Sequence, residues 1–202
     1  MLNIAVLVSG GGTNLQALLD AQAAGTLRSG RITLVVSSKE GAYALTRAQN
    51  AGVETAVLSR EGGETPAAYG ERLIAPLRAH GVGMVVLAGF MLILDACVIR
   101  AHEGRIVNVH PSLNPAFCGE GYYGLRVHRA ALSRGVKVTG ATVHLVNEIP
   151  DGGPILAQKA VEVLPGDTPE TLQRRVMEQA EWLLLPQETE KLARRLEGSE
   201  KA

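Results

Sequence analysis

The stretch RIVNVHPSLNP, residues 105–115, decides the fold and contains the first candidate site. Its opening residues, RIVNV, include three β-branched apolar side chains, which predicts a buried strand. Asn108 and His110 are two residues apart, so on a strand their side chains point to the same face. Pro111 cannot donate to a sheet ladder, so we expect the strand to end at His110. The stretch therefore places an amide and an imidazole side by side at a strand end, where open α/β sheets bind ligands. A capping Asn and a packed core His are the alternative interpretation.

The composition indicates a protein built around an apolar core. The chain has 202 residues, of which 46% are hydrophobic, and this fits one domain. Lys+Arg and Asp+Glu both number 20, and this balance argues against binding to nucleic acid or to an anionic membrane. Cys97 and Cys118 lack metal-type spacing, and no apolar run reaches about 18 residues. We therefore expect a cytoplasmic protein with free thiols.

A glycine-rich turn, SGGGTN at 9–14, follows the apolar run Leu2–Val8 and precedes a predicted helix from Leu15 to Ala24. A strand, a glycine turn and a helix can cradle a phosphate, because the first helical N–H groups point at the anion. The turn matches neither the dinucleotide fingerprint nor a Walker A loop, and the predicted strand 31–38 ends without the acid that an NAD site uses. The pattern favours a phosphate site, with a plain tight turn as the alternative.

The rest of the chain alternates between predicted strands and helices. Further strands are expected over 53–58, 83–88, 105–110, 137–146 and 155–163, and helices over 42–51, 66–80, 95–102, 125–134 and 170–185. This order predicts an α/β protein with a doubly wound, mostly parallel sheet. The last two strands follow each other without a helix, so one of them should be antiparallel. We expect Pro186 to break the C-terminal helix, and His102 to lie at the surface.

Several side chains are candidates for either a core or a site role. Alternation along the strand 137–146 places Thr142 and His144 on one face, where His144 is either a packed histidine or the partner of an acid. Asp151 lies in the turn NEIPDGG and is a turn residue unless it pairs with His110. The apolar loop 90–94 is either core or a wall for a flat ligand. The loop 112–124, rich in Gly, Pro and aromatic residues, is typical of a mobile loop over a site.

Together these segments resemble the folate-dependent formyltransferases, most closely the members that act on glycinamide ribonucleotide in purine biosynthesis. The resemblance rests on SGGGTNLQALLDA (9–21), VVLAGFMLIL (85–94), RIVNVHPSLNPAF (105–117), GATVHLVNEIPDGGPIL (140–156) and the helix 171–186. It implies a Rossmann-like fold in a single formyltransferase domain over 1–202. Residues 1–100 would bind the ribonucleotide phosphate, 101–186 would carry catalysis and folate binding, and 187–202 would form a charged C-terminal tail.

The resemblance also assigns site residues. Asn108, His110 and Asp151 would form the catalytic set, supported by Thr142 and His144. The ribonucleotide would be held by Gly12, Thr13, Asn14, Glu178 and Glu181. The folate would be held by Met91, Leu92, Ile93, Leu94, Asn108, Asn147, Glu148, Ile149, Pro150 and Asp151. Asn108 and a protonated His110 would donate hydrogen bonds to the developing oxyanion, and Asp151 would raise the pKa of His110.

The implied chemistry transfers the formyl group of 10-formyltetrahydrofolate, a consumed co-substrate, to the amine of 5-phosphoribosylglycinamide. No metal is implied, the partners are small molecules, and the chain would be a monomer or a homodimer. The sequence departs from the family pattern at Asn114, where an apolar residue is usual, at Leu92, where many members have Arg, and at Glu178, where some have Lys. Without that cation, the loop backbone and helix dipole would carry more of the phosphate binding.

Other functions would use similar residues. A formyltetrahydrofolate hydrolase would transfer the formyl group to water, and usually has an N-terminal regulatory domain, whereas the first predicted strand here starts at Leu2. A methionyl-tRNA formyltransferase usually has a further C-terminal domain and a basic surface. A Rossmann oxidoreductase or nucleotide-binding protein is disfavoured by the glycine pattern. A metal hydrolase that uses His110, His128 and His144 is disfavoured because the spacings match no standard ligand set.

Overall fold

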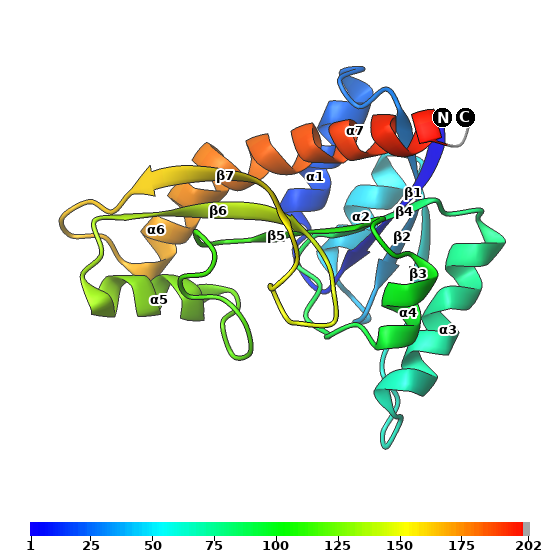
Figure 1. Ribbon diagram of the computed structural model, residues 1–202, viewed down its shortest axis with the longest axis horizontal. Helices are drawn as coiled ribbons and strands as arrows, with labels where there is room; N and C mark the ends of the chain where they lie inside the picture. The colour runs from blue at the N-terminus through cyan, green and yellow to red at the C-terminus, as the bar shows by residue number, and fades with distance from the viewer. Residues whose placement is uncertain (200–202) are drawn as a thin grey trace.

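The computed structural model describes residues 1–199, which form one seven-stranded sheet with helices on both faces (Figure 1). The strands are β1 (Leu2–Val8), β2 (Gly30–Ser37), β3 (Glu54–Val57), β4 (Met84–Leu87), β5 (Ile106–His110), β6 (Val138–Leu145) and β7 (Ile155–Glu162). The helices are α1 (Thr13–Ala23), α2 (Tyr43–Asn50), α3 (Pro66–Ala79), α4 (Ala96–Ala101), α5 (Leu125–Arg134), α6 (Pro169–Val176), the π-helical turn η1 (Met177–Glu181) and α7 (Trp182–Ser199).

The strand order, β3-β2-β1-β4-β5-β6-β7, confirms the predicted doubly wound sheet. The first five strands pair in parallel, whereas β6 is antiparallel to both β5 and β7. Of the last two strands, β6 is therefore the one that runs against the others, as the missing crossover helix requires. From β1 the chain adds strands first on one side, β2 and β3, and then on the other side, starting with β4. Ligands of open α/β sheets bind at such a switch point, here between β1 and β4.

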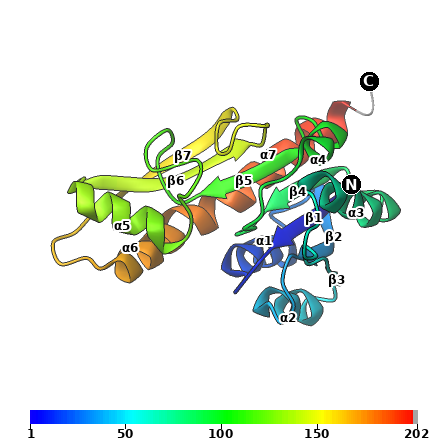
Figure 2. The ribbon, with the colours of Figure 1, turned by 90° about the horizontal axis from the view of Figure 1, so that it is seen from below.

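Each face of the sheet buries its own core because successive strand residues point to opposite sides. On β1, Ile4 and Val6 pack into the core beneath α1, α2, α6 and α7. Ala5 and Leu7, on the alternate positions, pack into the second core beneath α3 and α4. Figure 2 shows α5 and α6 beside β6 and β7, at the opposite end of the molecule from α3.

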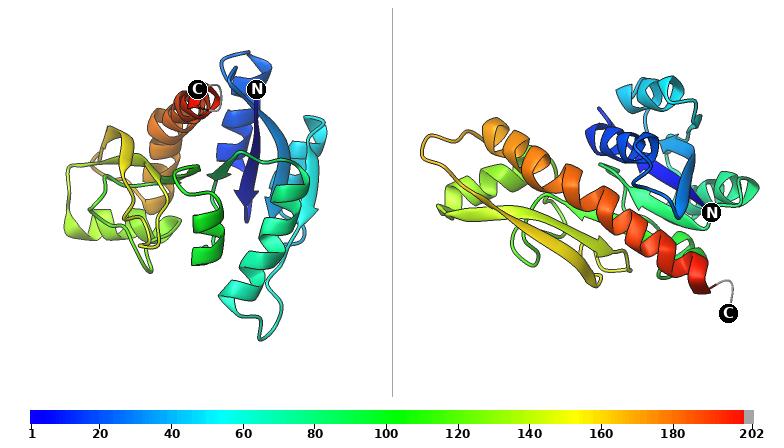
Figure 3. Two further views of the ribbon diagram at one scale, coloured as in Figure 1. Left: turned by 45° about the vertical axis from the view of Figure 1, so that its right-hand side comes forward. Right: turned by 90° about the horizontal axis from the view of Figure 1, so that it is seen from above.

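The C-terminal helix continues through Pro186, so the predicted break at this residue is wrong. Pro186 lies in the second turn of α7, just after the π-helical turn. Leu185 and Leu192, on either side of it, are buried in the core, and this packing outweighs the missing backbone hydrogen bond. Figure 3 shows α6, the π-helical turn and α7 as one long helix that runs towards the N-terminus.

The predicted charged tail is largely part of this helix, and residues 200–202 lie outside the described residues. Glu190 is buried and caps the loop before β2. Its Oε2 accepts hydrogen bonds from the backbone N–H groups of Arg28 (2.8 Å) and Ser29 (2.9 Å), and its Oε1 accepts one from Ser29 Oγ (2.9 Å). Through these hydrogen bonds, the Glu190 carboxylate connects α7 to the loop that precedes β2.

The predicted surface position of His102 is also wrong, since only 8% of this residue is exposed. His102 ends α4, and its Nδ1 lies 3.4 Å from the Val98 carbonyl oxygen one turn earlier. Burial lowers the pKa of His102, although the hydrogen bond to Val98 opposes this effect. Across residues 1–199, every helix is too short or too polar to cross a membrane.

Candidate active site

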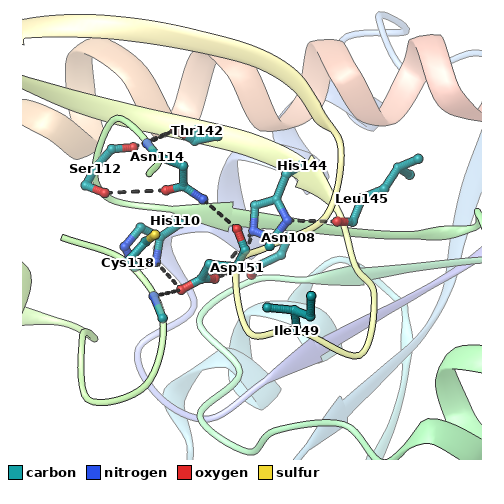
Figure 4. Close-up of polar contacts among 12 residues, drawn as sticks. Asn108, His110, Ser112, Asn114, Cys118, Thr142, His144, Leu145, Ile149 and Asp151 are labelled. Carbon is teal, nitrogen blue, oxygen red and sulfur yellow. Dashed lines mark hydrogen bonds and ion pairs between the residues drawn. The ribbon is translucent and has the colours of Figure 1, made fainter. Parts of the chain in front are cut away.

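The C-terminal end of β5 carries Asn108 and His110, as predicted. The β5–β6 register places Asn108 opposite His144, and His110 opposite Thr142. Directly opposed residues of antiparallel strands share a face, so the sheet itself brings these four side chains together. Figure 4 shows Asn108, His110 and His144 gathered around Asp151, which comes from the loop after β6, with Thr142 next to Ser112 and Asn114.

Asp151 is the hub of this cluster. Its Oδ2 lies 3.3 Å from His110 Nδ1 and accepts a hydrogen bond from the Gly119 backbone N–H at 2.9 Å. Its Oδ1 lies 3.3 Å from Asn108 Nδ2 and 3.4 Å from His144 Nε2. Burial raises the pKa of Asp151, but hydrogen bonds and the neighbouring histidines outweigh it, so the pKa lies below its usual range. The carboxylate is therefore ionised at neutral pH.

The His110 ring is buried between two acceptors. Its Nε2 lies 2.9 Å from the Phe117 carbonyl oxygen, and its Nδ1 faces the Asp151 carboxylate. A protonated ring satisfies both contacts, whereas a neutral ring donates to only one. Burial has the largest effect and lowers the pKa of His110, while Asp151 and the Phe117 carbonyl raise it. Asp151 acts in the predicted direction, but desolvation has the larger effect, so the pKa of His110 lies below its ordinary value.

Backbone conformation singles out the same cluster. Among residues 1–199, the only non-glycine residues with positive φ are Phe117 (51°) and Asp151 (54°). Both of them contact His110, one through its carbonyl and the other through its carboxylate. Non-glycine residues adopt this conformation at an energetic cost, and such residues concentrate at functional sites.

His144 and Thr142 form hydrogen bonds that position the catalytic candidates and the loop after β5. His144 Nδ1 donates to the Leu145 carbonyl oxygen at 2.8 Å, which leaves Nε2 facing Asn108 Nδ2 at 3.2 Å. Thr142 Oγ1 donates to the Ser112 carbonyl oxygen at 2.6 Å. His144 thus orients the Asn108 amide, and Thr142 holds the loop that follows β5.

A cavity of about 480 Å³ opens next to this cluster. Apolar side chains of the loop after β4, including Met91, Leu92 and Ile93, form one wall. Asn108, His110 and the loop 147–151 line the opposite side. All ten residues expected to hold the folate therefore line one cavity. Its size and its mixture of apolar walls with a few polar groups are typical of a small-molecule site.

Residues of the loop 119–124 complete the cavity, and the sequence analysis did not identify them individually. They include Tyr122 and Tyr123, which are 39% and 46% exposed. Their only signal in the sequence was the Gly, Pro and aromatic content of the loop, which predicted a cover over a site. The site also includes Ser9, whose Oγ accepts a hydrogen bond from the Met91 backbone N–H at 2.8 Å and links the loops after β1 and β4.

The glycine turn after β1 forms the entry to α1, as predicted. Gly12 has φ +72°, and a Cβ atom there would lie 2.6 Å from Ala44 Cβ, so both the conformation and the packing require glycine. Gly10 and Gly11 have open space beside them. The N-terminal N–H groups of α1 are thus presented at the carboxyl edge of the sheet, where an anion can reach them.

Asn14 and Glu181 meet in the interior although 167 positions separate them in the sequence. Asn14 Nδ2 donates to Glu181 Oε2 at 2.7 Å, and Asn14 Oδ1 is buried without a hydrogen-bond partner. Burial raises the pKa of Glu181 to about 7, with the Asn14 hydrogen bond opposing it. Glu178, three positions earlier on the π-helical turn, is exposed. Of the two predicted acids, the structure joins only Glu181 to the glycine turn.

His128 is buried on α5, and both ring nitrogens are without a hydrogen-bond partner. Burial, helped by the charge of His110, lowers its pKa to about 4. Within residues 1–199, no set of three or more His, Cys, Asp and Glu side chains has the geometry to hold a metal ion.

Comparison with known proteins assigns the family. The formyl transferase family model matches residues 2–188. The chain is 40% identical to a chloroplastic phosphoribosylglycinamide formyltransferase of Vigna unguiculata over 86% of this chain and 55% of that protein. It is 39% identical to the phosphoribosylglycinamide formyltransferase of Escherichia coli strain K12, over 88% of this chain and 81% of that protein. The chain thus spans only about half the length of the chloroplastic relative.

A solved structure agrees with these relatives. The glycinamide ribonucleotide transformylase 1 of Symbiobacterium toebii superposes with a TM-score of 0.90 at 42% sequence identity, covering 96% of this chain and 89% of that one. The family model, over residues 2–188, includes all seven strands, the residues that line the cavity and the glycine turn. The protein described here therefore belongs to the formyl transferase family.

Proposed function

We propose that this protein transfers the formyl group of 10-formyltetrahydrofolate to the amine of 5-phosphoribosylglycinamide, a step of purine biosynthesis. The observation that carries the proposal is the cluster of Asn108, His110 and Asp151 at the edge of the apolar cavity. The names of the relatives support the choice of substrates.

The cavity fits the pterin end of the folate, and the glycine turn fits the phosphate. Loops 91–94 and 147–151 supply apolar surface and backbone polar groups for a flat, heteroaromatic ring. The turn at Gly12 lies at the neighbouring strand end, because β1 and β4 are adjacent and Ser9 joins their loops. The amine of the ribonucleotide would then lie between Glu181 and the formyl group.

In the proposed reaction the amine nitrogen attacks the formyl carbon, and the carbonyl oxygen becomes an oxyanion. One Nδ2 hydrogen of Asn108 stays on His144 Nε2 and orients the amide, while the second leaves its 3.3 Å contact with Asp151 Oδ1 and is donated to this oxygen. Negative charge on the oxygen favours protonation of His110, so the ring contributes most in the transition state. The bond from the formyl carbon to the folate nitrogen then breaks. The proton lost by the amine passes to that nitrogen, with Asp151 and His110 as the relay.

The partners that we propose are small molecules and not nucleic acid. The formal net charge of the chain is zero, whereas proteins that bind nucleic acid usually have an excess of positive charge. The two cysteines are free in the structure, and a reducing, cytoplasmic location is the setting we expect for them. A monomer or a homodimer remains the predicted state.

The decisive experiment follows tetrahydrofolate release from 10-formyltetrahydrofolate with and without 5-phosphoribosylglycinamide. We expect release to depend on the amine, and kcat to fall by about 10²–10³ in His110→Ala and in Asp151→Asn. His80→Gln removes a partly exposed histidine far from the cavity and should leave kcat unchanged. Equal release without the amine would instead identify a hydrolase, and no release from the folded protein would contradict the choice of substrates.

A further inference from the structure

Position 114 lies in the loop after β5 and is occupied by Asn. The side chain is buried, with 7% of the residue exposed. A buried amide without hydrogen bonds would be costly, so the contacts of this side chain indicate its function.

The Asn114 amide joins the catalytic candidate Asp151 to the loop after β5. Its Nδ2 donates to the Asp151 backbone carbonyl oxygen at 3.0 Å, and its Oδ1 accepts a hydrogen bond from Ser112 Oγ at 3.4 Å (Figure 4). An apolar side chain of similar size can make neither contact. The loop of Asp151 is therefore held by a hydrogen bond that depends on the amide at position 114.

The backbone of residue 114 is itself fixed to the sheet. Its N–H donates to Thr142 Oγ1 on β6 at 3.0 Å, and its carbonyl accepts a hydrogen bond from Gln158 Nε2 on β7 at 3.0 Å. Gln158 also donates to Thr142 Oγ1 at 3.0 Å. Two strands therefore hold the anchor in place, and Asn114 can fix the position of the group to which it bonds.

Asp151 needs such an anchor. Its φ of 54° is unfavourable for a non-glycine residue, and the preceding residues 148–150 are exposed. Its carboxylate meets four groups at 2.9–3.4 Å, and these contacts depend on the direction in which the backbone places the side chain. A change in φ would move the carboxylate away from His110.

We propose that Asn114 is a positioning residue that holds Asp151 in its left-handed conformation and so keeps the carboxylate against His110 and Asn108. This inference rests on the proposed function, because it assigns Asn114 to the same site. A second consequence does not depend on the reaction. The charge of Asp151 should raise the pKa of the His110 ring only while Asn114 holds the Asp151 loop in place.

The test compares Asn114→Leu with the wild-type protein by two measurements. Titration of the His110 ring by NMR should show a lower pKa in the variant, because the carboxylate that raises it has moved away. In the formyl-transfer assay we expect kcat to fall at least about tenfold, and by up to about 10²-fold for a shift of ~1 Å, with a smaller change in KM. The matched control is Asn3→Leu, the same substitution at an amide outside the site, where Asn3 Nδ2 donates to the His80 carbonyl oxygen at 2.9 Å.

A second variant covers the case in which Asn114→Leu does not fold. In Asn114→Asp, the introduced carboxyl group can donate to the Asp151 carbonyl oxygen when protonated and repels it when ionised. The kcat of this variant relative to wild type should therefore fall as the pH rises. The inference is wrong if folded variants keep both kcat and the His110 titration, or if Asn3→Leu moves both equally. Wild-type protein without transferase activity would contradict the proposed function, while the His110 titration would still test the role of Asn114.

Discussion

At the scale of single residues, burial decides the ionisation of the groups around the site. Glu181 and His110 are 6% and 4% exposed, and burial shifts each pKa towards the neutral form. Asp151 is the exception, because four hydrogen-bond or charge contacts hold its pKa low. The site therefore combines one ionised acid, a second acid with a pKa of about 7, and an imidazole whose neutral form is favoured by burial.

Glu181 gives a prediction about stability. Its pKa is about 7 in the folded protein and 4.5 for an ordinary glutamate, so between these pH values the folded state binds the extra proton. The contribution of Glu181 to the free energy of unfolding should therefore decrease as the pH rises from 4.5 to 7, by at most roughly 3 kcal/mol, whereas the buried histidines contribute in the opposite direction. In Glu181→Gln only the contribution of Glu181 is absent, so the free energy of unfolding of wild type should fall relative to that of the variant as the pH rises, as measured by urea unfolding at several pH values.

Glu178→Gln is the matched control, because Glu178 is an exposed acid on the same π-helical turn. Its pH dependence should follow that of the wild-type protein. If Glu181→Gln also runs parallel to wild type, the carboxyl group of Glu181 does not retain a proton in the folded state.

At the scale of elements, helix α2 supports the glycine turn from behind. The Ala44 backbone N–H donates to the Gly10 carbonyl oxygen at 3.1 Å, and Arg47 Nε donates to the Gly11 carbonyl oxygen at 2.8 Å. Arg47 also donates to Gln16 Oε1 at 2.9 Å and lies over the Tyr43 ring, 5.0 Å from its centre. With two carbonyl groups held by α2, the turn keeps its N–H groups available for an anion.

We predict that Arg47→Met weakens ribonucleotide binding. Loss of one hydrogen bond from a charged group, about 1.5 kcal/mol, corresponds to roughly a tenfold higher KM for the ribonucleotide. The KM for the folate and the kcat should change little, because the cavity lies on the other side of β4. Arg134→Met, which removes an exposed arginine from α5, serves as the control. A fall in kcat with unchanged KM would contradict this role for α2.

At the scale of the whole molecule, burial lowers the pKa of three histidines that lie in different elements. His102 follows the last residue of α4, His110 lies in the site and His128 is buried on α5. Burial lowers the pKa of all three, so the folded protein takes up fewer protons than the unfolded chain as the solution becomes acidic. The stability that their neutral forms contribute is present above pH 6.5 and is lost as the pH falls.

His128 allows this to be tested outside the site. Its pKa falls from 6.5 to about 4, which corresponds to a loss of roughly 3 kcal/mol of stability between these pH values. His128→Leu should reduce that loss, and it should not destabilise the protein at pH 7, because both ring nitrogens lack partners. Urea unfolding of both proteins at pH 5 and pH 7 measures this. A variant that remains as acid-sensitive as wild type would disprove the role of His128.

The sequence by itself determined the features that depend on short segments. The alternation of apolar strands and amphipathic helices predicted the doubly wound sheet, and the missing crossover before β7 predicted an antiparallel strand. The spacing of Asn108 and His110 placed them on one face of β5. Local periodicity, proline and glycine encode these features, because strand geometry repeats every two residues whatever the rest of the chain does.

Only the tertiary structure decided which distant groups meet and which polar groups are buried. His102 is buried and Pro186 lies inside a helix because core packing outweighs local preference. The path of the loop after β6 brings Asp151 to Asn114, and a π-helical turn directs Glu181 inward to the glycine turn. Such contacts join residues far apart in the chain, and their energies come from burial and hydrogen bonding in a particular packed arrangement, which no local pattern encodes.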